Sequence, residues 1–64
     1  MELNIRKIKL ELERLGWTKY RLAKEMGVKH QWVYYIIQHP ESCTLKTVTK
    51  FGEALGIDPR DLVI

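Results

Sequence analysis

The chain has 64 residues, 45% of them hydrophobic, and 11 Lys and Arg against 8 Asp and Glu give it a net charge of +3. This length allows one domain, residues 1–64, and excludes a doubly wound sheet or a barrel, while the apolar content excludes a disordered tail. The single cysteine, Cys43, excludes an internal disulfide, and its spacing from His30 and His39 fits no metal site, so we expect neither a metal nor a cofactor.

The first predicted helix covers residues 5–15. Asn4 is suited to cap its N-terminus, and Leu3, directly before the cap, is placed to pack on Ile8. Gly16 supplies the left-handed residue that commonly ends a helix. The stripe that should face the core consists of Ile5, Ile8, Leu12 and Leu15.

Two short helices follow, with almost nothing between them. The second helix covers 19–26, begins after Thr18 as its cap and stops at Gly27. The third covers 29–38, because Pro40 disfavours helical geometry in the residue before it. The residues that should face the core from this pair are Leu22, Ala23, Met26, Val33, Ile36 and Ile37.

Beyond a loop over residues 41–43, a fourth helix is predicted over 45–55. Thr44 is its N-cap, and Gly56 closes it. Its apolar residues recur every three or four positions, as expected of a helix packed on a core. This stripe consists of Leu45, Val48, Phe51 and Leu55.

A short fifth helix is predicted over 59–63. Asp58 is its cap, Pro59 takes the first helical position, where its missing N–H costs nothing, and Asp61 completes a pattern like a capping box. Strand signals are nearly absent. The chain therefore predicts an all-α fold of five short helices.

The turn at Gly27-Val28 is the most informative feature. A turn this tight, with a glycine at its corner, joins the crossed helices of a helix-turn-helix. Counted from Lys19 as position one, that motif needs apolar residues at positions four, eight, ten, fifteen and eighteen, an alanine at five and a glycine at nine. The chain meets these needs with Leu22, Met26, Val28, Val33, Ile36, Ala23 and Gly27.

These residues resemble a known family. The segment GWTKYRLAKEMGV, residues 16–28, is similar to the start of a Cro/lambda-repressor-type (XRE-like) helix-turn-helix domain, and residues 44–58 are similar to the family's fourth helix and its exit. The resemblance covers roughly residues 5–64. It implies a compact, five-helix, lambda-repressor-like fold with the helix-turn-helix at the second and third helices. It also implies sequence-specific binding of double-stranded DNA, commonly as a homodimer, by a bacterial, phage or plasmid transcriptional regulator.

The chain departs from the family pattern at several positions. Lys19 stands where relatives usually have another polar residue, often Gln, and Lys29 stands where they usually have Ser or Thr. Leu12 and Ile37 stand where many relatives have a paired Arg and Glu. Replacing both ends of a buried ion pair by hydrophobic residues is often neutral or stabilising. We therefore expect Leu12 and Ile37 to touch in the core.

The third helix would contact bases in the major groove with its N-terminal residues. A helical wheel turns Gln31, Tyr34, Tyr35 and Gln38 outward. Gln31 suits adenine, and Lys29 and His30 suit guanine. The expected base contacts are Lys29, His30, Gln31, Tyr34 and Tyr35, and the expected phosphate contacts are Thr18, Lys19, Gln38 and Lys46.

Plainer interpretations stay open at this point. Lys19 and Lys29 are also compatible with solvated charges, Gln31 with an inert surface residue, and His30 with capping or packing. Residues 1–40 carry a net +4 and residues 41–64 a net −1, a balance that permits nucleic-acid binding without requiring it. Trp32 is expected to pack over the helix pair.

The main expectation is a DNA-binding transcriptional regulator of the Cro/repressor type. The alternative is a protein-interaction module, adaptor or antitoxin-like, that uses the aromatic residues Trp32, Tyr34 and Tyr35. An enzyme is not expected, because no nucleophile is placed beside a base and an acid. No apolar run reaches about 18 residues, and the first residues lack a signal-peptide pattern, so we expect a cytoplasmic location and no membrane. No small-molecule ligand is evident from the sequence.

Overall fold

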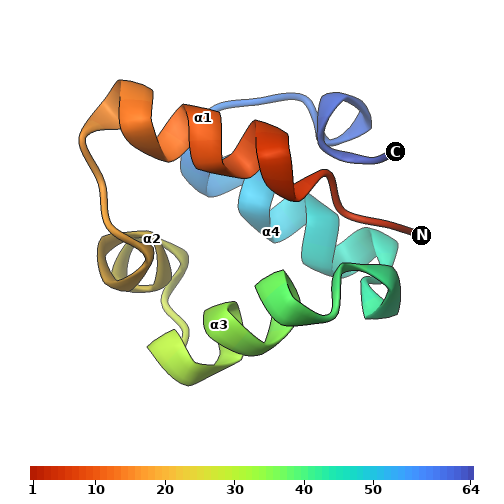
Figure 1. The fold of residues 1–64 in the computed structure, drawn as a ribbon, viewed down its shortest axis with the longest axis horizontal. Helices are drawn as coiled ribbons and strands as arrows, with labels where there is room; N and C mark the ends of the chain where they lie inside the picture. The colour runs from red at the N-terminus through yellow and green to blue at the C-terminus, as the bar shows by residue number, and fades with distance from the viewer.

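Short connections separate four α-helices, which stack around one core (Figure 1). The computed structural model describes residues 1–64. Two single turns of 3-10 helix complete the fold, which contains no strand. The elements in chain order are α1 (Ile5–Leu15), α2 (Lys19–Met26), α3 (His30–Gln38), η1 (Pro40–Ser42), α4 (Leu45–Leu55) and η2 (Pro59–Leu62).

The predicted capping residues set the bounds of α1, α2 and α4. In each of these helices the side chain of the N-cap accepts a hydrogen bond from the backbone N–H three residues later, as for Asn4 at 3.1 Å, Thr18 at 3.1 Å and Thr44 at 3.3 Å. A glycine in the left-handed region follows the last helical residue of each. The predicted bounds of these three helices are confirmed.

The third helix begins one residue later than predicted. Lys29 is not helical but extended, with φ −73° and ψ 142°, and its side chain makes no capping hydrogen bond. The reason is local. Gly27 has left-handed backbone angles that end α2, and the backbone changes direction over Val28 and Lys29 before the next helix begins. The prediction that Lys29 opens the helix was therefore wrong, and His30 is its first residue.

The predicted fifth helix over 59–63 is a single 3-10 turn, η2. Asp58 caps it, but the hydrogen bonds come from the backbone N–H of Arg60 to the Asp58 carboxylate, 2.9 Å, and of Asp61 to the Asp58 carbonyl, 2.9 Å. The Asp61 carboxylate makes no reciprocal bond, so the capping-box prediction was wrong. The turn cannot lengthen, because Val63 is extended and pairs with Leu3.

This pairing of the two ends of the chain was not predicted. The N–H of Asn4 donates to the carbonyl of Leu62 at 2.7 Å, and the N–H of Ile64 donates to the carbonyl of Glu2 at 2.9 Å. The N–H of Leu3 donates to the carbonyl of Pro40 at 3.0 Å, which ties the N-terminal segment to η1 as well. Figure 1 shows the two termini side by side.

Residues 41–43, predicted as a loop, divide between η1 and the core. Ser42 closes η1 with two hydrogen bonds to the carbonyl of His39, from its N–H at 3.1 Å and from its hydroxyl at 2.8 Å. Cys43 then turns inward and is buried. This burial raises the pKa of its thiol.

All four helices contribute to one core. Its buried members are Leu3, Ile8, Leu12, Leu22, Ala23, Val33, Ile36, Cys43, Val48, Phe51, Leu55 and Leu62. Met26 and Ile37 pack against it from the outside. The contact expected between Leu12 and Ile37 stays a prediction, although both side chains belong to this apolar region.

Leu45 is a correction to the predicted stripe of α4. Its side chain is 63% exposed, whereas the other three members of that stripe are buried. Leu45 is the first residue of α4 and lies at one edge of the stripe, about 60° from Val48 and about 120° from Phe51 around the helix. No helix of the protein is both long and apolar enough to cross a membrane.

Candidate nucleic-acid interface

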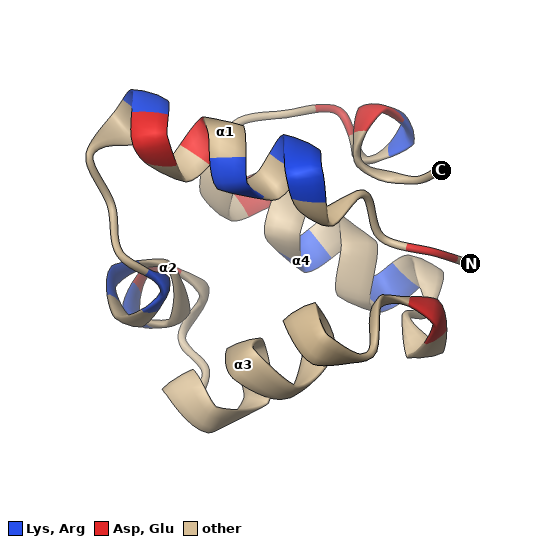
Figure 2. Cartoon of the chain, in the orientation of Figure 1, with Lys and Arg blue, Asp and Glu red and all other residues tan.

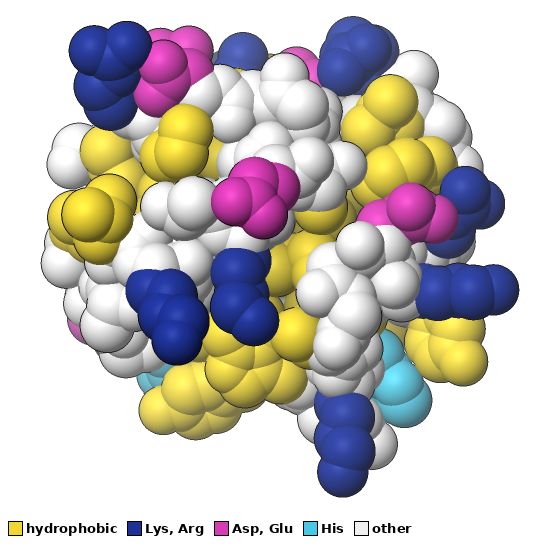
Figure 3. All heavy atoms as spheres, turned by 180° about the vertical axis from the view of Figure 1, so that it is seen from behind, with side chains coloured by type: hydrophobic (Ala, Val, Ile, Leu, Met, Phe, Trp, Pro, Cys, Tyr) yellow, Lys and Arg dark blue, Asp and Glu magenta, His cyan; other side chains and the backbone are white.

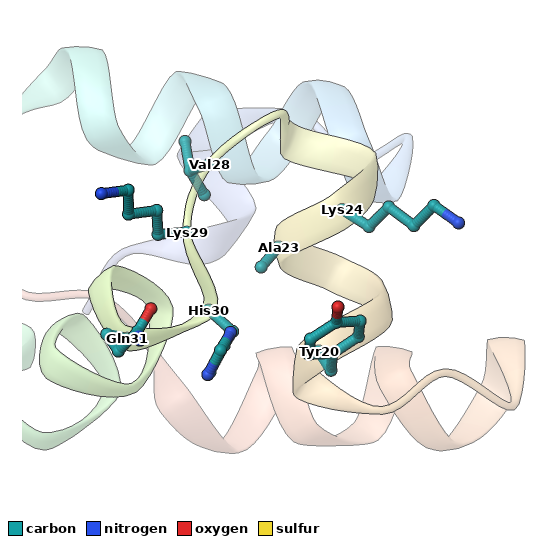
Figure 4. Close-up of a pocket in the computed structure, with 7 residues that line it drawn as sticks. All are labelled: Tyr20, Ala23, Lys24, Val28, Lys29, His30 and Gln31. Carbon is teal, nitrogen blue, oxygen red and sulfur yellow. The ribbon is translucent and has the colours of Figure 1, made fainter.

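A surface hollow opens where the outer face of α2 meets the start of α3 (Figure 4). Its volume is about 350 Å³. Side chains of both helices and of the connection between them form its walls. The lining residues are Tyr20, Ala23, Lys24, Val28, Lys29, His30 and Gln31. Three of the five predicted base-contact residues, Lys29, His30 and Gln31, thus come together at one place.

The connection between α2 and α3 creates this hollow. Gly27 has φ 72°, in the left-handed region, and the N–H of Val28 donates to the carbonyl of Ala23 at 3.0 Å, which closes the end of α2. Only residues 27–29 separate the helices, so α3 starts beside α2. The small side chain of Ala23 is buried at their contact and allows the close approach.

Three aromatic rings form a cluster on the edge of the hollow, which we call the aromatic cluster: Tyr20, His30 and Tyr34. The ring centroids of Tyr20 and His30 lie 5.2 Å apart, and those of His30 and Tyr34 lie 5.7 Å apart in an edge-on arrangement. The ammonium of Lys19 lies 5.7 Å from the centroid of the Tyr34 ring. Packing of His30, one of its predicted roles, is therefore confirmed.

The fourth and fifth predicted base contacts lie further along α3. Tyr34 joins the hollow only through the aromatic cluster, and its side chain is 43% exposed. Tyr35 is exposed as predicted, but its ring packs on His39, with centroids 4.7 Å apart, near the C-terminal end of α3. The structure therefore separates Tyr35 from the hollow.

The predicted phosphate contacts lie at both ends of α3. Thr18 and Lys19 are at the start of α2, close to the aromatic cluster. The Thr18 hydroxyl accepts the capping bond and keeps its own hydrogen free to donate. Gln38 ends α3, and Lys46 lies in the first turn of α4, which follows η1; both side chains are exposed.

Carboxylates are absent from this surface. Residues 26–40 contain no Asp or Glu, and the ribbon of α3 carries no charged residue in Figure 2. The nearest carboxylate on α2, Glu25, is paired with Arg21 at 2.9 Å. Glu41, at the far end, lies 3.9 Å from His39. Figure 3 shows Lys and Arg side chains spaced among hydrophobic ones where both histidine side chains emerge.

The two tryptophans serve the fold. Trp32 stacks on the buried ring of Phe51, with centroids 6.1 Å apart and planes 21° from parallel, so it packs in the fold as predicted, but its aromatic partner lies in α4 rather than in the helix pair. Trp17, predicted at the core or its rim, is half-buried against the core. The guanidinium of Arg21 lies 5.2 Å from the centre of its ring.

Two residues of the hollow were missed by the sequence interpretation, Tyr20 and Lys24. The signal for them was present, because positions 20, 23 and 24 have the spacing that places them on one face of a helix. Beyond its N-terminus, with Thr18 and Lys19, that helix was interpreted only for the residues it turns inward. The wheel that placed outward residues was applied to the third helix alone.

The hollow holds no cluster of three or more metal-ligating side chains, and neither does the rest of the protein. Two carboxylates with lowered pKa values lie on α1 and at η2. Arg14 lowers the pKa of Glu11 through a hydrogen bond on α1, and Arg60 lowers the pKa of Asp58 to about 2 at η2. The side chains of the hollow are thus aromatic and amide groups between lysines.

Comparison with known proteins gives no relative: no family model, curated protein or solved structure matches the chain. The function of this surface is therefore inferred from its residues and geometry.

Proposed function

We propose that the chain is a Cro/lambda-repressor-type helix-turn-helix domain that binds double-stranded DNA in a sequence-specific manner and regulates transcription. In this proposal α2 and α3 are the two helices of the motif, and α3 enters the major groove. One observation carries the proposal. Lys29, directly before α3, comes together with His30 and Gln31, the first two residues of α3, and residues 26–40 contain no carboxylate.

The short connection supports the motif. A left-handed Gly27 and two further residues join the helices, and Ala23 is buried where they touch. These are the features that a helix-turn-helix needs to bring its second helix out beside the first. The exposed side chains at the start of α3, such as Gln31, are the part that would meet base edges.

The side chains at the start of α3 match the donors and acceptors of the major groove. Gln31 is exposed and can bond to both N6 and N7 of adenine. Lys29 is exposed and can donate to O6 and N7 of guanine, and the half-buried His30 can donate to the same atoms. Tyr34 and Tyr35 continue this face and suit thymine methyl groups or phosphates.

The charges suit an extended polyanion rather than a small anion. The ammonium groups of Lys24 and Lys29 point away from each other on opposite sides of the hollow (Figure 4). Thr18 and Lys19, at the exposed N-terminus of α2, can bind a phosphate on one side of α3. Gln38 and Lys46 can do so at its other end.

A protein-interaction module is the second candidate, favoured by the exposed rings of Tyr20, Tyr34 and Tyr35. It is the weaker one for two reasons. The indole of Trp32, the residue type most typical of interface hot spots, is engaged with Phe51 inside the fold. The remaining aromatic rings are accompanied by lysines, which are depleted at protein interfaces.

The test is selection of a random duplex DNA pool by the purified protein, followed by affinity measurements at several salt concentrations. We expect an enriched motif and a logarithmic salt slope of about −0.9 for each phosphate neutralised. A two-fold dimer would enrich half-sites roughly 34 Å apart, about one helical turn. No enrichment, with weak binding even at low salt, would leave the aromatic residues as a protein-docking surface instead.

A further inference from the structure

The ring of Tyr20 reaches from α2 to the first residue of α3. Its centroid lies 5.2 Å from that of His30, with the two planes tilted by 42°. The ring is nevertheless 60% exposed, so it adds little to the core. The side chain of Tyr20 is thus mostly in water, yet it contacts one residue of the neighbouring helix. This combination indicates a role other than packing in the core.

The start of α3 lacks the usual means of fixing its side chains. Lys29, the N-cap, makes no side-chain hydrogen bond. The imidazole of His30 takes part in no hydrogen bond or ion pair within the protein; its ordered neighbours are the rings of Tyr20 and Tyr34. The direction in which the His30 imidazole projects therefore depends on the aromatic cluster.

We propose that Tyr20 is a positioning residue for DNA recognition: its ring holds the His30 imidazole in the orientation from which it contacts a base. The inference rests on the proposed function. A side chain that is already ordered loses less rotamer freedom when DNA binds, and this raises affinity without a new contact. Tyr20 acts through His30, and its ring rather than its hydroxyl is the part required.

This role separates Tyr20 from its neighbours in the hollow. Lys29 and Gln31 flank His30 in the sequence and are exposed, so they can reach DNA without support from α2. His30 is half-buried, and the ring on its α2 side belongs to Tyr20. Sequence spacing alone gives no reason to link positions 20 and 30.

The experiment is a double-mutant cycle on the duplex recovered from the random pool. Affinities are measured for the wild type, Tyr20→Ala, His30→Ala and the double variant. We expect Tyr20→Ala to weaken binding by roughly 2- to 10-fold, the cost of ordering one side chain, and to have no further effect once His30 is alanine. Leu10→Ala, which truncates an exposed apolar residue on α1, should leave affinity unchanged.

Two further measurements separate positioning from a general structural effect. Tyr20→Phe keeps the ring and should restore wild-type affinity. In the free protein, NMR should show a ring-current shift of the His30 ring protons that disappears in Tyr20→Ala and persists in Tyr20→Phe. The thermal midpoints of the three proteins should agree, because the ring is mostly exposed.

The outcomes are distinguishable. If Tyr20→Ala costs as much without His30 as with it, Tyr20 contacts DNA by itself and the positioning role is overturned. If affinity does not change in Tyr20→Ala although the wild type enriches a motif, the inference fails while the proposed function stands. If the wild type enriches no duplex, the proposed function fails, and this inference with it.

Discussion

The indole of Trp32 lies over the ring of Phe51, with centroids 6.1 Å apart and planes 21° from parallel. Phe51 is fully buried in α4, so this contact attaches the outward-facing helix α3 to the centre of the core. On the other side, Tyr20 and His30 link α3 to α2. Besides its buried core residues Val33 and Ile36, α3 thus makes one aromatic contact with the core and one at the surface.

Truncation of Trp32 should therefore lower the free energy of unfolding rather than remove a contact with DNA. We expect Trp32→Ala to reduce the free energy of unfolding by about 2–4 kcal/mol, in the lower part of the range for aromatic truncations because the ring is only half-buried. Urea unfolding followed by circular dichroism measures this. Trp32→Phe keeps a stacked ring and should lose less. Full stability with lost base preference would show that Trp32 contacts DNA instead.

Gly52 should tolerate no side chain, although it lies inside a helix. An added Cβ would lie 2.6 Å from the carbonyl oxygen of Ile57 and 3.2 Å from Cγ of Pro59. Alanine favours helix over glycine by about 1 kcal/mol, but the neighbour here is backbone and cannot rotate away. We expect Gly52→Ala to destabilise the protein by about 1–3 kcal/mol.

A thermal melt of Gly52→Ala against the wild type checks this prediction. Glu53→Ala is the matched control, since it changes the next residue of α4 at an exposed position and should stay within about 0.5 kcal/mol. An unchanged or raised midpoint for Gly52→Ala would mean that η2 moves easily away from α4.

The parts of the fold that sequence predicted are those with local causes. Thr18 caps α2 with its own side chain, and Gly27 ends it with its own backbone angle, so both are visible in a few residues. The pairing of Leu3 with Val63 joins backbone groups from opposite ends of the chain and leaves no side-chain pattern. Leu45 was misplaced because a spacing of three or four residues does not show which member lies at the exposed edge of the stripe.

The candidate site was predictable to a similar degree. The outward position of Gln31 was predicted correctly, because a pattern within one helix gives it, whereas the start of α3 was predicted one residue too early, at Lys29. The contact between Tyr20 and His30 depends on how two helices cross, and spacing within either helix cannot give that. Tyr35 was predicted to contact bases together with the residues at the start of α3, but its ring packs on His39 near the other end of the helix. Relations between elements were the part that required the structure.

Gln31 should carry base preference. We expect Gln31→Ala to relax one position of the enriched motif, at a cost of about 1–3 kcal/mol on the preferred base and little on the others. Competition binding with single-base variants of the duplex measures this. Gln38→Ala, at the other end of α3, should instead weaken all duplexes alike. An equal loss on every base for Gln31→Ala would reassign Gln31 to phosphate.

Lys46 should contribute charge rather than sequence preference. We expect Lys46→Ala to make the logarithmic salt slope shallower by about 0.9 and to weaken binding to all duplexes similarly. Titrations at four or five salt concentrations give the slope. Lys9→Ala removes an exposed charge from α1, on the side of the molecule away from α3 in Figure 1, and should leave the slope unchanged. A loss confined to one motif position would contradict the assignment.

Asp58 should make the stability of the protein depend on pH. Its hydrogen bonds with Arg60 lower its pKa from 3.8 to about 2 in the folded protein. The stabilisation is therefore fully present above about pH 4 and is lost as pH falls toward 2. Asp58→Asn keeps an acceptor for the N–H of Arg60 but carries no charge, so its deficit in unfolding free energy should shrink over that interval.

Chemical unfolding of both proteins at pH 2, 3, 4 and 6 measures this difference. Asp61→Asn is the control, because its carboxylate is exposed and accepts no hydrogen bond, and it should follow the wild type. Parallel pH curves for Asp58→Asn and the wild type would show that Arg60 stabilises η2 only through the neutral capping bond. The cap itself would then account for the turn, and the ion pair, with both partners exposed, would contribute nothing measurable.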